Sequence, residues 1–200
     1  MTDVSQRQEL VTATRELMLA VTVTDVDRVE LESATDAIRA ITERLSVQRR
    51  ARGQKMPFSA AAQTRADSPD RAITLSPYNP IGIPLAVTFG EDGSASATLV
   101  ADALLEGPRD AVHGGTSAWL LDALFGVLVR AQGIQAVTGT LELRYRHRTP
   151  LDQPLGLYAR VKGRSGRKIQ VEGWIEHEGR HTVEANGLFI AIDAPAPGGV

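Results

Sequence analysis

Residues 113–132 read HGGTSAWLLDALFGVLVRAQ, and this stretch decides the fold. Apolar side chains fall on nearly every face of a helix built over residues 116–132, so we predict a helix that is buried on most of its sides. Such a helix needs a partner that covers it from several directions.

The sequence on both sides of the helix predicts this cover. LAVTF, the turn GEDGS and ASATLV predict a β-hairpin before it. After it, strands are predicted for AVTGTLELRYRHR, LGLYARVKGR, KIQVEGWIEH and HTVEANGLFIAI, with turns at SGR and EGR. In the first of these strands, Leu141 and Leu143 point to one face and Thr140 to the other. We therefore predict an α+β fold in which one antiparallel sheet wraps around one central helix.

The same patterns divide the chain into four segments. Residues 1–52 show apolar side chains at helical spacing and predict a helical N-terminal extension. Residues 53–84 contain five prolines and predict a linker or an irregular arm. Residues 85–192 form the predicted helix-and-sheet domain, and residues 193–200 are expected to be a flexible tail.

The composition limits the classes of function. The chain has 200 residues, of which 42% are hydrophobic, and its net charge of −2 argues against a dedicated nucleic-acid binder. The absence of cysteine excludes disulfides, a cysteine nucleophile and thiolate metal sites. No apolar run is long enough for a membrane span, and the N-terminus lacks a signal-peptide pattern, so we expect a cytoplasmic protein.

The start of the central helix is the first candidate site. The glycines of His113-Gly114-Gly115-Thr116 let the backbone approach a ligand closely, and Thr116 can serve as the N-cap. Free N–H groups at a helix start carry the positive end of the helix dipole and can stabilise an oxyanion. The same residues also fit an ordinary glycine turn that enters a helix, and the pattern alone leaves both interpretations open.

Asp122 is the second candidate, because it interrupts an otherwise apolar helix. A carboxylate in such a position either bonds a nearby N–H or hydroxyl, or serves as a general base or nucleophile. Nine residues separate His113 from Asp122, which places them half a turn out of phase. If both serve one site, that site uses helix ends from two subunits.

A basic segment and a histidine-containing string are the remaining candidates for a binding site. Residues 140–170 contain eight basic side chains against two acidic ones; most are typical of a solvated β face, and the turn at 163–168 is the candidate phosphate contact. The string HEGRH at 177–181 matches a zinc motif literally. It falls on a turn between two predicted strands, so we predict no metal site there.

Three stretches taken together resemble the hotdog-fold acyl-CoA thioesterases of the PaaI-like family. They are HGGTSAWLLDALFGVLVRAQG, VTGTLELRYRHRTPLDQPL and ARVKGRSGRKIQVEGWIEHEGRHTVEANGLFIAI, and the resemblance covers roughly residues 85–192. The family fold is an antiparallel sheet wrapped around a central helix. The resemblance implies an acyl-CoA substrate, no cofactor or metal, and a homodimer that often pairs into a tetramer.

The resemblance also implies roles for individual residues. Asp122 matches the catalytic carboxylate, which acts as general base on water or as nucleophile. Gly114 matches the glycine whose N–H polarises the thioester carbonyl from the other subunit, with His113 flanking the site and Gly115 beside the substrate. Thr140 matches a hydroxyl residue that orients the water. The matching hairpin that touches CoA in relatives comprises Arg164, Ser165, Gly166, Arg167, Lys168 and Ile169.

We therefore expect an acyl-CoA thioesterase that releases a free acid and CoA. The alternatives are a hotdog dehydratase or hydratase acting on hydroxyacyl thioesters, and a non-catalytic acyl-CoA sensor with residues 1–52 as a partner-binding or DNA-binding arm. Residues 1–55 hold nine acidic and nine basic side chains, which argues against DNA. One position departs from the family: some relatives have Asn six residues before the histidine, where this chain has Gly107.

Overall fold

A computed structural model describes residues 4–67 and 72–192. The tail expected at residues 193–200 lies outside the described residues. The helices are α1 (Val4–Val23), α2 (Arg28–Ser46), α3 (Ala60–Asp67) and α4 (Gly114–Ala131), with a short 3-10 turn, η1 (Ala103–Leu105). The strands are β1 (Ile73–Thr74), β2 (Ala86–Phe89), β3 (Ala95–Val100), β4 (Ala136–Tyr145), β5 (Pro154–Ser165), β6 (Lys168–His177) and β7 (Arg180–Ala191).

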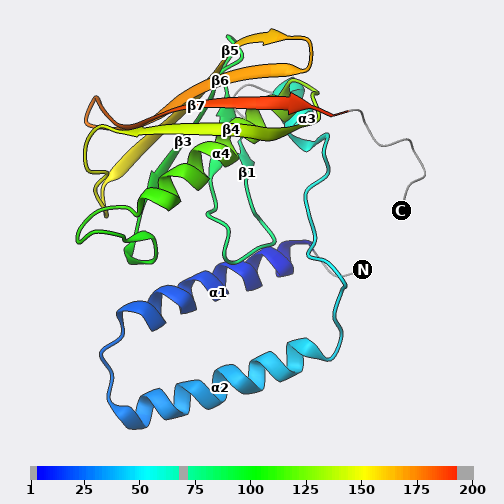
Figure 1. Cartoon of the computed structure of the whole chain (residues 1–200). Helices are drawn as coiled ribbons and strands as arrows, with labels where there is room; N and C mark the ends of the chain where they lie inside the picture. Colours follow the sequence, from blue (N-terminus) through cyan, green and yellow to red (C-terminus); the bar gives the residue numbers. More distant parts are fainter. Residues whose placement is uncertain (1–3, 68–71, 193–200) are drawn as a thin grey trace.

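The described strands form one antiparallel sheet in the order β1-β2-β3-β5-β6-β7-β4. The sheet curves around α4, as Figure 1 shows, so the predicted hotdog architecture is confirmed. The hairpins β2–β3, β5–β6 and β6–β7 all form as the turn sequences predict. Strand β4 pairs only with β7 in this sheet and therefore has one free edge.

The core lies between α4 and the concave face of the sheet. Nine residues of α4 are buried, among them Leu121, Leu124 and Phe125, and alternate residues of β5, β6 and β7 face them. Two glycines make room for Phe125, because a Cβ added at Gly173 or Gly187 would lie 2.5 or 2.8 Å from its ring. This close approach explains glycine inside two central strands.

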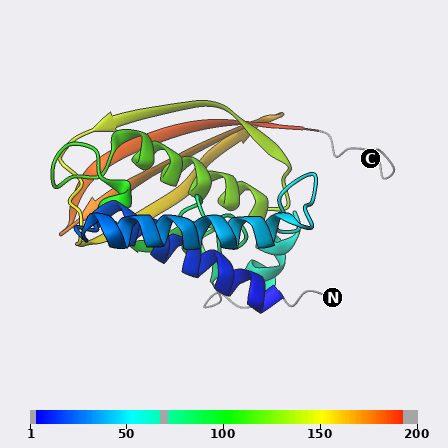
Figure 2. The same cartoon turned by 90° about the horizontal axis from the view of Figure 1, so that it is seen from below.

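The N-terminal helices lie outside this core, below α4 and the sheet (Figures 1 and 2). Helix α1 buries Val11 and contacts η1. Helix α2 begins with Asp27 as N-cap, whose side chain accepts the Glu30 N–H, yet none of its residues, all of which the structure describes, is buried.

The segment expected to be a linker is more regular than its prolines suggest. Residues 53–84 contain α3 and the short strand β1, and the side chain of Ala61 joins the hydrophobic core. Strand β1 extends the sheet by pairing with β2 at Ile73 and Thr74. The prolines at 57, 77, 80 and 84 therefore flank these short elements and do not prevent them, whereas Pro69 lies outside the described residues.

Candidate active site

The start of α4 is capped by the histidine, and not by Thr116. His113 has extended backbone angles, and its Nδ1 accepts the Gly115 N–H at 3.0 Å. A neutral ring with Nδ1 as acceptor carries its proton on Nε2, so Nε2–H remains a donor. Thr116 lies inside the first turn of the helix.

The N–H of Gly114 is left without an acceptor in the described part of the chain, residues 4–67 and 72–192. It is one of the donors that a helix start cannot satisfy internally. The Gly115 N–H is already taken by His113, so Gly114 supplies the freer of the two donors. The carbonyl of Gly114 accepts the Tyr145 hydroxyl at 2.9 Å, which ties the end of β4 to the start of α4.

Asp122 lies in the middle of α4 and is partly buried. Its Oδ1 accepts the Thr138 hydroxyl at 2.8 Å, so strand β4 holds the carboxylate in place. One oxygen of the carboxylate remains to accept a proton or to attack a carbonyl.

The hydroxyl beside Asp122 thus belongs to Thr138 in this chain, and not to Thr140. The strand pairing shifts between the two threonines, so that Thr138 lies opposite Phe189 and Thr140 opposite Leu188. Since facing residues of paired strands share a face, the shift turns Thr138 towards the buried Phe189 and Thr140 to the other side of the sheet. The sequence carried one signal for this irregularity, the glycine at 139 inside a strand.

A cavity of about 1330 Å³ opens beside Asp122 and Thr138. Its walls come from α4, the beginning of β4, the segment 52–58 before α3 and the loop 75–79 after β1. The lining combines apolar side chains with a few polar ones, which is typical of small-molecule sites. Two segments of the N-terminal 84 residues therefore contribute directly to the space around the candidate carboxylate.

The structure leaves no room for a side chain at position 107. A Cβ added there would lie 2.6 Å from Cα of His113, so the asparagine of some relatives does not fit this backbone. Gly107 lets the two segments touch, and the Leu105 carbonyl accepts the His113 N–H at 2.8 Å. The close approach holds the helix start in place.

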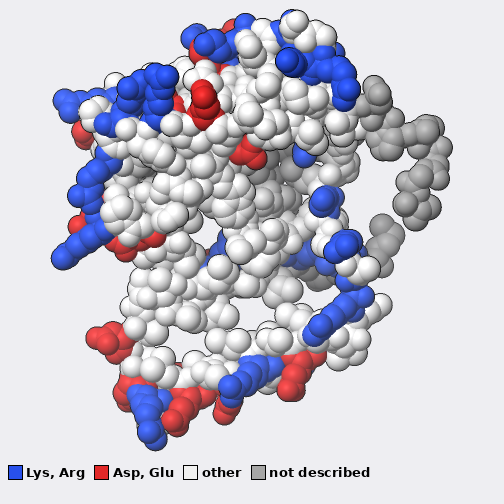
Figure 3. Space-filling model, viewed as in Figure 1, with Lys and Arg blue, Asp and Glu red and all other residues white. Residues whose placement is uncertain are grey.

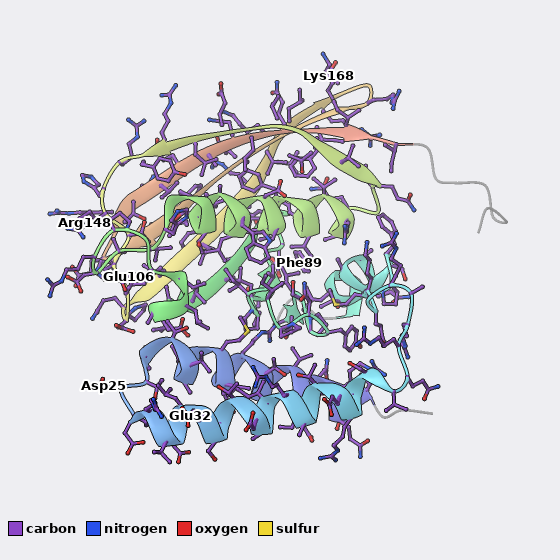
Figure 4. The ribbon with its side chains drawn as sticks, turned by 60° about the horizontal axis from the view of Figure 1, so that its bottom comes forward. Asp25, Glu32, Phe89, Glu106, Arg148 and Lys168 are labelled. Carbon is purple, nitrogen blue, oxygen red and sulfur yellow. The ribbon has the colours of Figure 1, made fainter. Side chains whose placement is uncertain are left out.

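The basic hairpin lies away from this cavity in the single chain. None of the six hairpin residues is among the described residues that line the cavity. Arg167 donates to the Ala191 carbonyl at 2.9 Å, and Ile169 is buried in the core. Lys168 projects from the hairpin on the side of the sheet away from α4 (Figure 4). Contact of this hairpin with CoA remains a prediction.

The HEGRH string forms the tight turn that the sequence predicts. His177 ends β6, Glu178 and Gly179 have φ angles of 48° and 75°, and His181 lies in β7. Among the described residues no group of three or more His, Asp or Glu side chains is arranged to hold a metal ion.

Comparison with known proteins agrees with this architecture. Residues 110–184, from the approach to α4 to the middle of β7, match the model of the Thioesterase superfamily. The match covers α4 and the strands β4, β5 and β6, in the part of the chain that we call the thioesterase domain. One crystal structure of a thioesterase superfamily protein is 28% identical, with a TM-score of 0.78, over 92% of this chain and 90% of that one. That match extends beyond the thioesterase domain into the N-terminal helices.

Other structures match about half of the chain. A hypothetical thioesterase with coenzyme A from Streptococcus pneumoniae is 20% identical, with a TM-score of 0.51, over 54% of this chain and 85% of that one. PaaI from the phenylacetic acid degradation operon of E. coli is 18% identical, with a TM-score of 0.50, over 53% of this chain and 82% of that one. These identities establish the fold. Together the comparisons support the expected enzyme class, a thioester hydrolase.

No helix in the described ranges combines the length and apolar character that crossing a bilayer requires.

Proposed function

We propose that the protein is an acyl-CoA thioesterase in which Asp122 activates water or attacks the thioester itself. The observation that carries this proposal is a carboxylate held by a threonine hydroxyl at 2.8 Å on the wall of a large cavity. The thioesterase from Streptococcus pneumoniae was solved with coenzyme A, and smu.793 from Streptococcus mutans, which matches the fold, was solved bound to acetyl CoA, which supports the substrate class.

The spacing of the two residues supports their role. The Streptococcus pneumoniae thioesterase has been solved as an Asp-to-Ala and as a Thr-to-Ala variant, at positions sixteen residues apart. Asp122 and Thr138 are also sixteen residues apart. Thr138 is accordingly our choice for the hydroxyl that positions the carboxylate and the water.

In the general-base route, Asp122 accepts a proton from water while the water oxygen attacks the thioester carbonyl. The resulting oxyanion needs a donor, and the unpaired N–H of Gly114 at a helix start is suited to it. The C–S bond then breaks, the acid is released, and the CoA thiolate leaves and is protonated. In the alternative route the Asp122 carboxylate attacks the thioester carbonyl, the C–S bond breaks and the CoA thiolate leaves and is protonated. Water then hydrolyses the mixed anhydride, which releases the acid and restores the carboxylate.

One subunit cannot bring these groups together. Gly114 and Asp122 are eight residues apart on one helix, which is about 12 Å along its axis. A thioester carbonyl at Asp122 is therefore out of reach of the Gly114 N–H of the same chain. A second copy has to supply the oxyanion donor.

The free edge of β4 offers the place for the second copy. Exposed edges of this length are prone to pair with another strand. Thr138, near one end of β4, bonds Asp122, while Tyr145, at the other end, bonds Gly114. An antiparallel pair of two β4 edges sets the Thr138 end of one strand beside the Tyr145 end of the other. This arrangement brings the Gly114 N–H of one copy towards the Asp122 of its partner, in a homodimer that we locate, as the sequence predicts, in the cytoplasm.

Free-thiol release from a panel of acyl-CoAs tests the proposal, with Asp122→Asn beside the wild type. We expect turnover by the wild type and a loss of at least about a hundredfold in kcat for the variant, the low end for a general base. Undiminished activity of the folded variant would sink the mechanism. Hydration of an enoyl-CoA without thiol release would favour the dehydratase instead.

A further inference from the structure

The cavity beside Asp122 continues along one face of α4. Asp122, Gly126 and Arg130 all line it, and they follow one another at four-residue spacing. Residues four apart lie one above the other on a helix, so the three positions form a stripe about 12 Å long. The candidate carboxylate lies at one end of this stripe and a guanidinium at the other.

The middle of the stripe is open. A Cβ added at Gly126 would meet nothing within 4 Å, so the surrounding structure does not require glycine there. Glycine inside a helix is unfavourable relative to alanine. The missing side chain leaves a groove on α4 that passes from Asp122 towards Arg130.

Three cationic side chains lie on the wall of the cavity. Arg52, Lys55 and Arg130 line the cavity, and none of them forms an ion pair with a described residue. Asp122 is the sole carboxylate among the described residues of the lining. Figure 3 shows basic side chains gathered along the stretch that leads from α2 towards α3, which contains two of these cations.

Much of the remaining wall is apolar, although Gln54, Ser76 and Asn79 also line it. Met56, Phe58, Leu75 and Tyr78 line the space, so the body of a ligand there contacts carbon. The loop that carries Tyr78 is held from α1 by Arg15, whose guanidinium donates to the carbonyls of Ser76, Asn79, Pro80 and Gly82 at 2.6–3.2 Å.

We propose that this groove takes the acyl part of the substrate, and that the acyl group ends in an anion, a carboxylate, which Arg130 and Lys55 contact. The inference rests on the proposed thioesterase function and deepens it by naming the substrate class, an acyl-CoA with a carboxylate at the far end of an apolar chain. The acyl chain of the substrate lies over Gly126, and its thioester lies at Asp122.

The experiment compares acyl-CoAs of equal length with and without the terminal carboxylate: adipoyl-CoA against hexanoyl-CoA, and suberoyl-CoA against octanoyl-CoA. We expect the wild type to prefer the carboxylated member of each pair in kcat/KM. Arg130→Gln removes a charge-assisted hydrogen bond and should lower that preference roughly ten- to hundredfold, whereas Arg130→Lys keeps most of it.

Arg49→Gln is the matched control, since Arg49 is close to Arg52 in the chain, bonds Ser46 and does not line the cavity. The Arg49→Gln variant should prefer the carboxylated acyl-CoAs in kcat/KM as strongly as the wild type does. Gly126→Leu fills the groove and should reduce turnover of suberoyl-CoA and octanoyl-CoA more than that of acetyl-CoA. Gly126→Ala adds a single methyl group that meets nothing within 4 Å, so it should reduce turnover of the longer substrates less than Gly126→Leu does.

The phosphates of CoA offer the same anionic chemistry, and acyl-pantetheine thioesters, which lack the nucleotide, separate the two sources. Phosphate binding would make Arg130→Gln lower kcat/KM equally for both members of a pair, and this loss would disappear with pantetheine thioesters. That result would overturn the proposal. A wild type that hydrolyses the neutral acyl-CoAs as well as the carboxylated ones would overturn it while leaving the thioesterase function intact. Absence of thiol release from every acyl-CoA would instead overturn the thioesterase function.

Discussion

Helices α4 and α2 have nearly the same length, 18 and 19 residues, and opposite environments. Nine residues of α4 are buried under the sheet, whereas every residue of α2, which the structure describes in full, keeps contact with solvent. The apolar side chains of α2 nevertheless follow a regular order, with Leu31, Ile38 and Leu45 seven residues apart. The comparison teaches that helical periodicity predicts the helix but not what the helix packs against.

Helix α1 stands between these extremes. Val11 is buried and Arg15 bonds four carbonyls of the loop 76–82, while Leu10 and Leu17 are exposed. The extension is therefore attached to the thioesterase domain through one face of α1, with α2 outside it (Figure 2).

One pair of identical substitutions tests the contrast between α4 and α2. Leu124→Ala leaves a cavity in the core and should lower the free energy of unfolding by about 2–5 kcal/mol. Leu31→Ala in α2 changes a side chain that is 45% exposed and should alter it by no more than about 0.5 kcal/mol. Denaturant unfolding of both variants measures the two values. Comparable losses would mean that α2 has a packing partner in solution.

A second pair compares the attachment of α1 with the surface of α2. Arg15→Met removes the donor from four loop carbonyls and should lower stability by about 1–3 kcal/mol. Arg28→Met in α2 breaks only an exposed ion pair with Glu32 and should cost about 0.5 kcal/mol or less. Thermal unfolding and proteolysis of the 76–82 loop report the difference; equal behaviour of the two variants contradicts the attachment through Arg15.

Within the thioesterase domain, two threonines of β4 form a sharper comparison. Thr138→Val keeps the shape but loses the hydrogen bond to Asp122, and should lower kcat/KM about tenfold, the equivalent of one hydrogen bond to a charged group. Thr140→Val changes the other face of the sheet and should leave the rate unchanged. Steady-state kinetics with one acyl-CoA measures both effects. A larger loss in Thr140→Val than in Thr138→Val would mean that Thr140 supplies the hydroxyl that positions the carboxylate and the water.

The smallest expected effect lies on the outer face of the sheet. Lys162 and Arg160 bond Glu172 at 2.8 and 2.6 Å and lower the pKa of its carboxyl group. Because the folded pKa is the lower one, this stabilisation is complete above the unfolded pKa and disappears as the pH falls through the folded value.

Glu172→Gln should therefore lower the free energy of unfolding by about 1 kcal/mol or less at neutral pH and leave it unchanged in strong acid. Denaturant unfolding from neutral to acidic pH follows this convergence. Glu142→Gln, at a position with no ion pair to a described residue, is the control and should show no such convergence. A constant difference between wild type and Glu172→Gln at all pH values would contradict the account.

The sequence predicts the thioesterase domain well because its signals are local. The apolar pattern around Asp122 and the strand alternation after it reproduce α4 and the strands that cover it. Prolines obscured α3 and β1, whose formation depends on contacts with the core through residues such as Ala61.

The candidate site is predicted only in part, for a physical reason. Asp122 and the glycines are visible as residues, but Thr138 becomes its partner through a shift in the pairing of β4 with β7, which is a property of two strands. The roles of Gly126 and Arg130 depend likewise on the cavity above them. The sequence HGGT does not determine the backbone angles of His113, so it does not show that this residue, and not Thr116, caps the helix.

The shared site is tested most directly by complementation between two inactive variants. Asp122→Ala removes the carboxylate. Gly114→Pro removes the N–H at the first helical position. The backbone angles of His113 (φ −59°, ψ 134°) are compatible with a following proline, and the Tyr145 side chain, 3.2 Å from the added Cβ, has to shift by a few tenths of an ångström. The two variants, co-expressed with different tags and purified as hetero-oligomers, should regain thioesterase activity, because one site of each pair combines an intact Asp122 with an intact Gly114. Hetero-oligomers as inactive as each variant alone would contradict a site built from two copies of the chain.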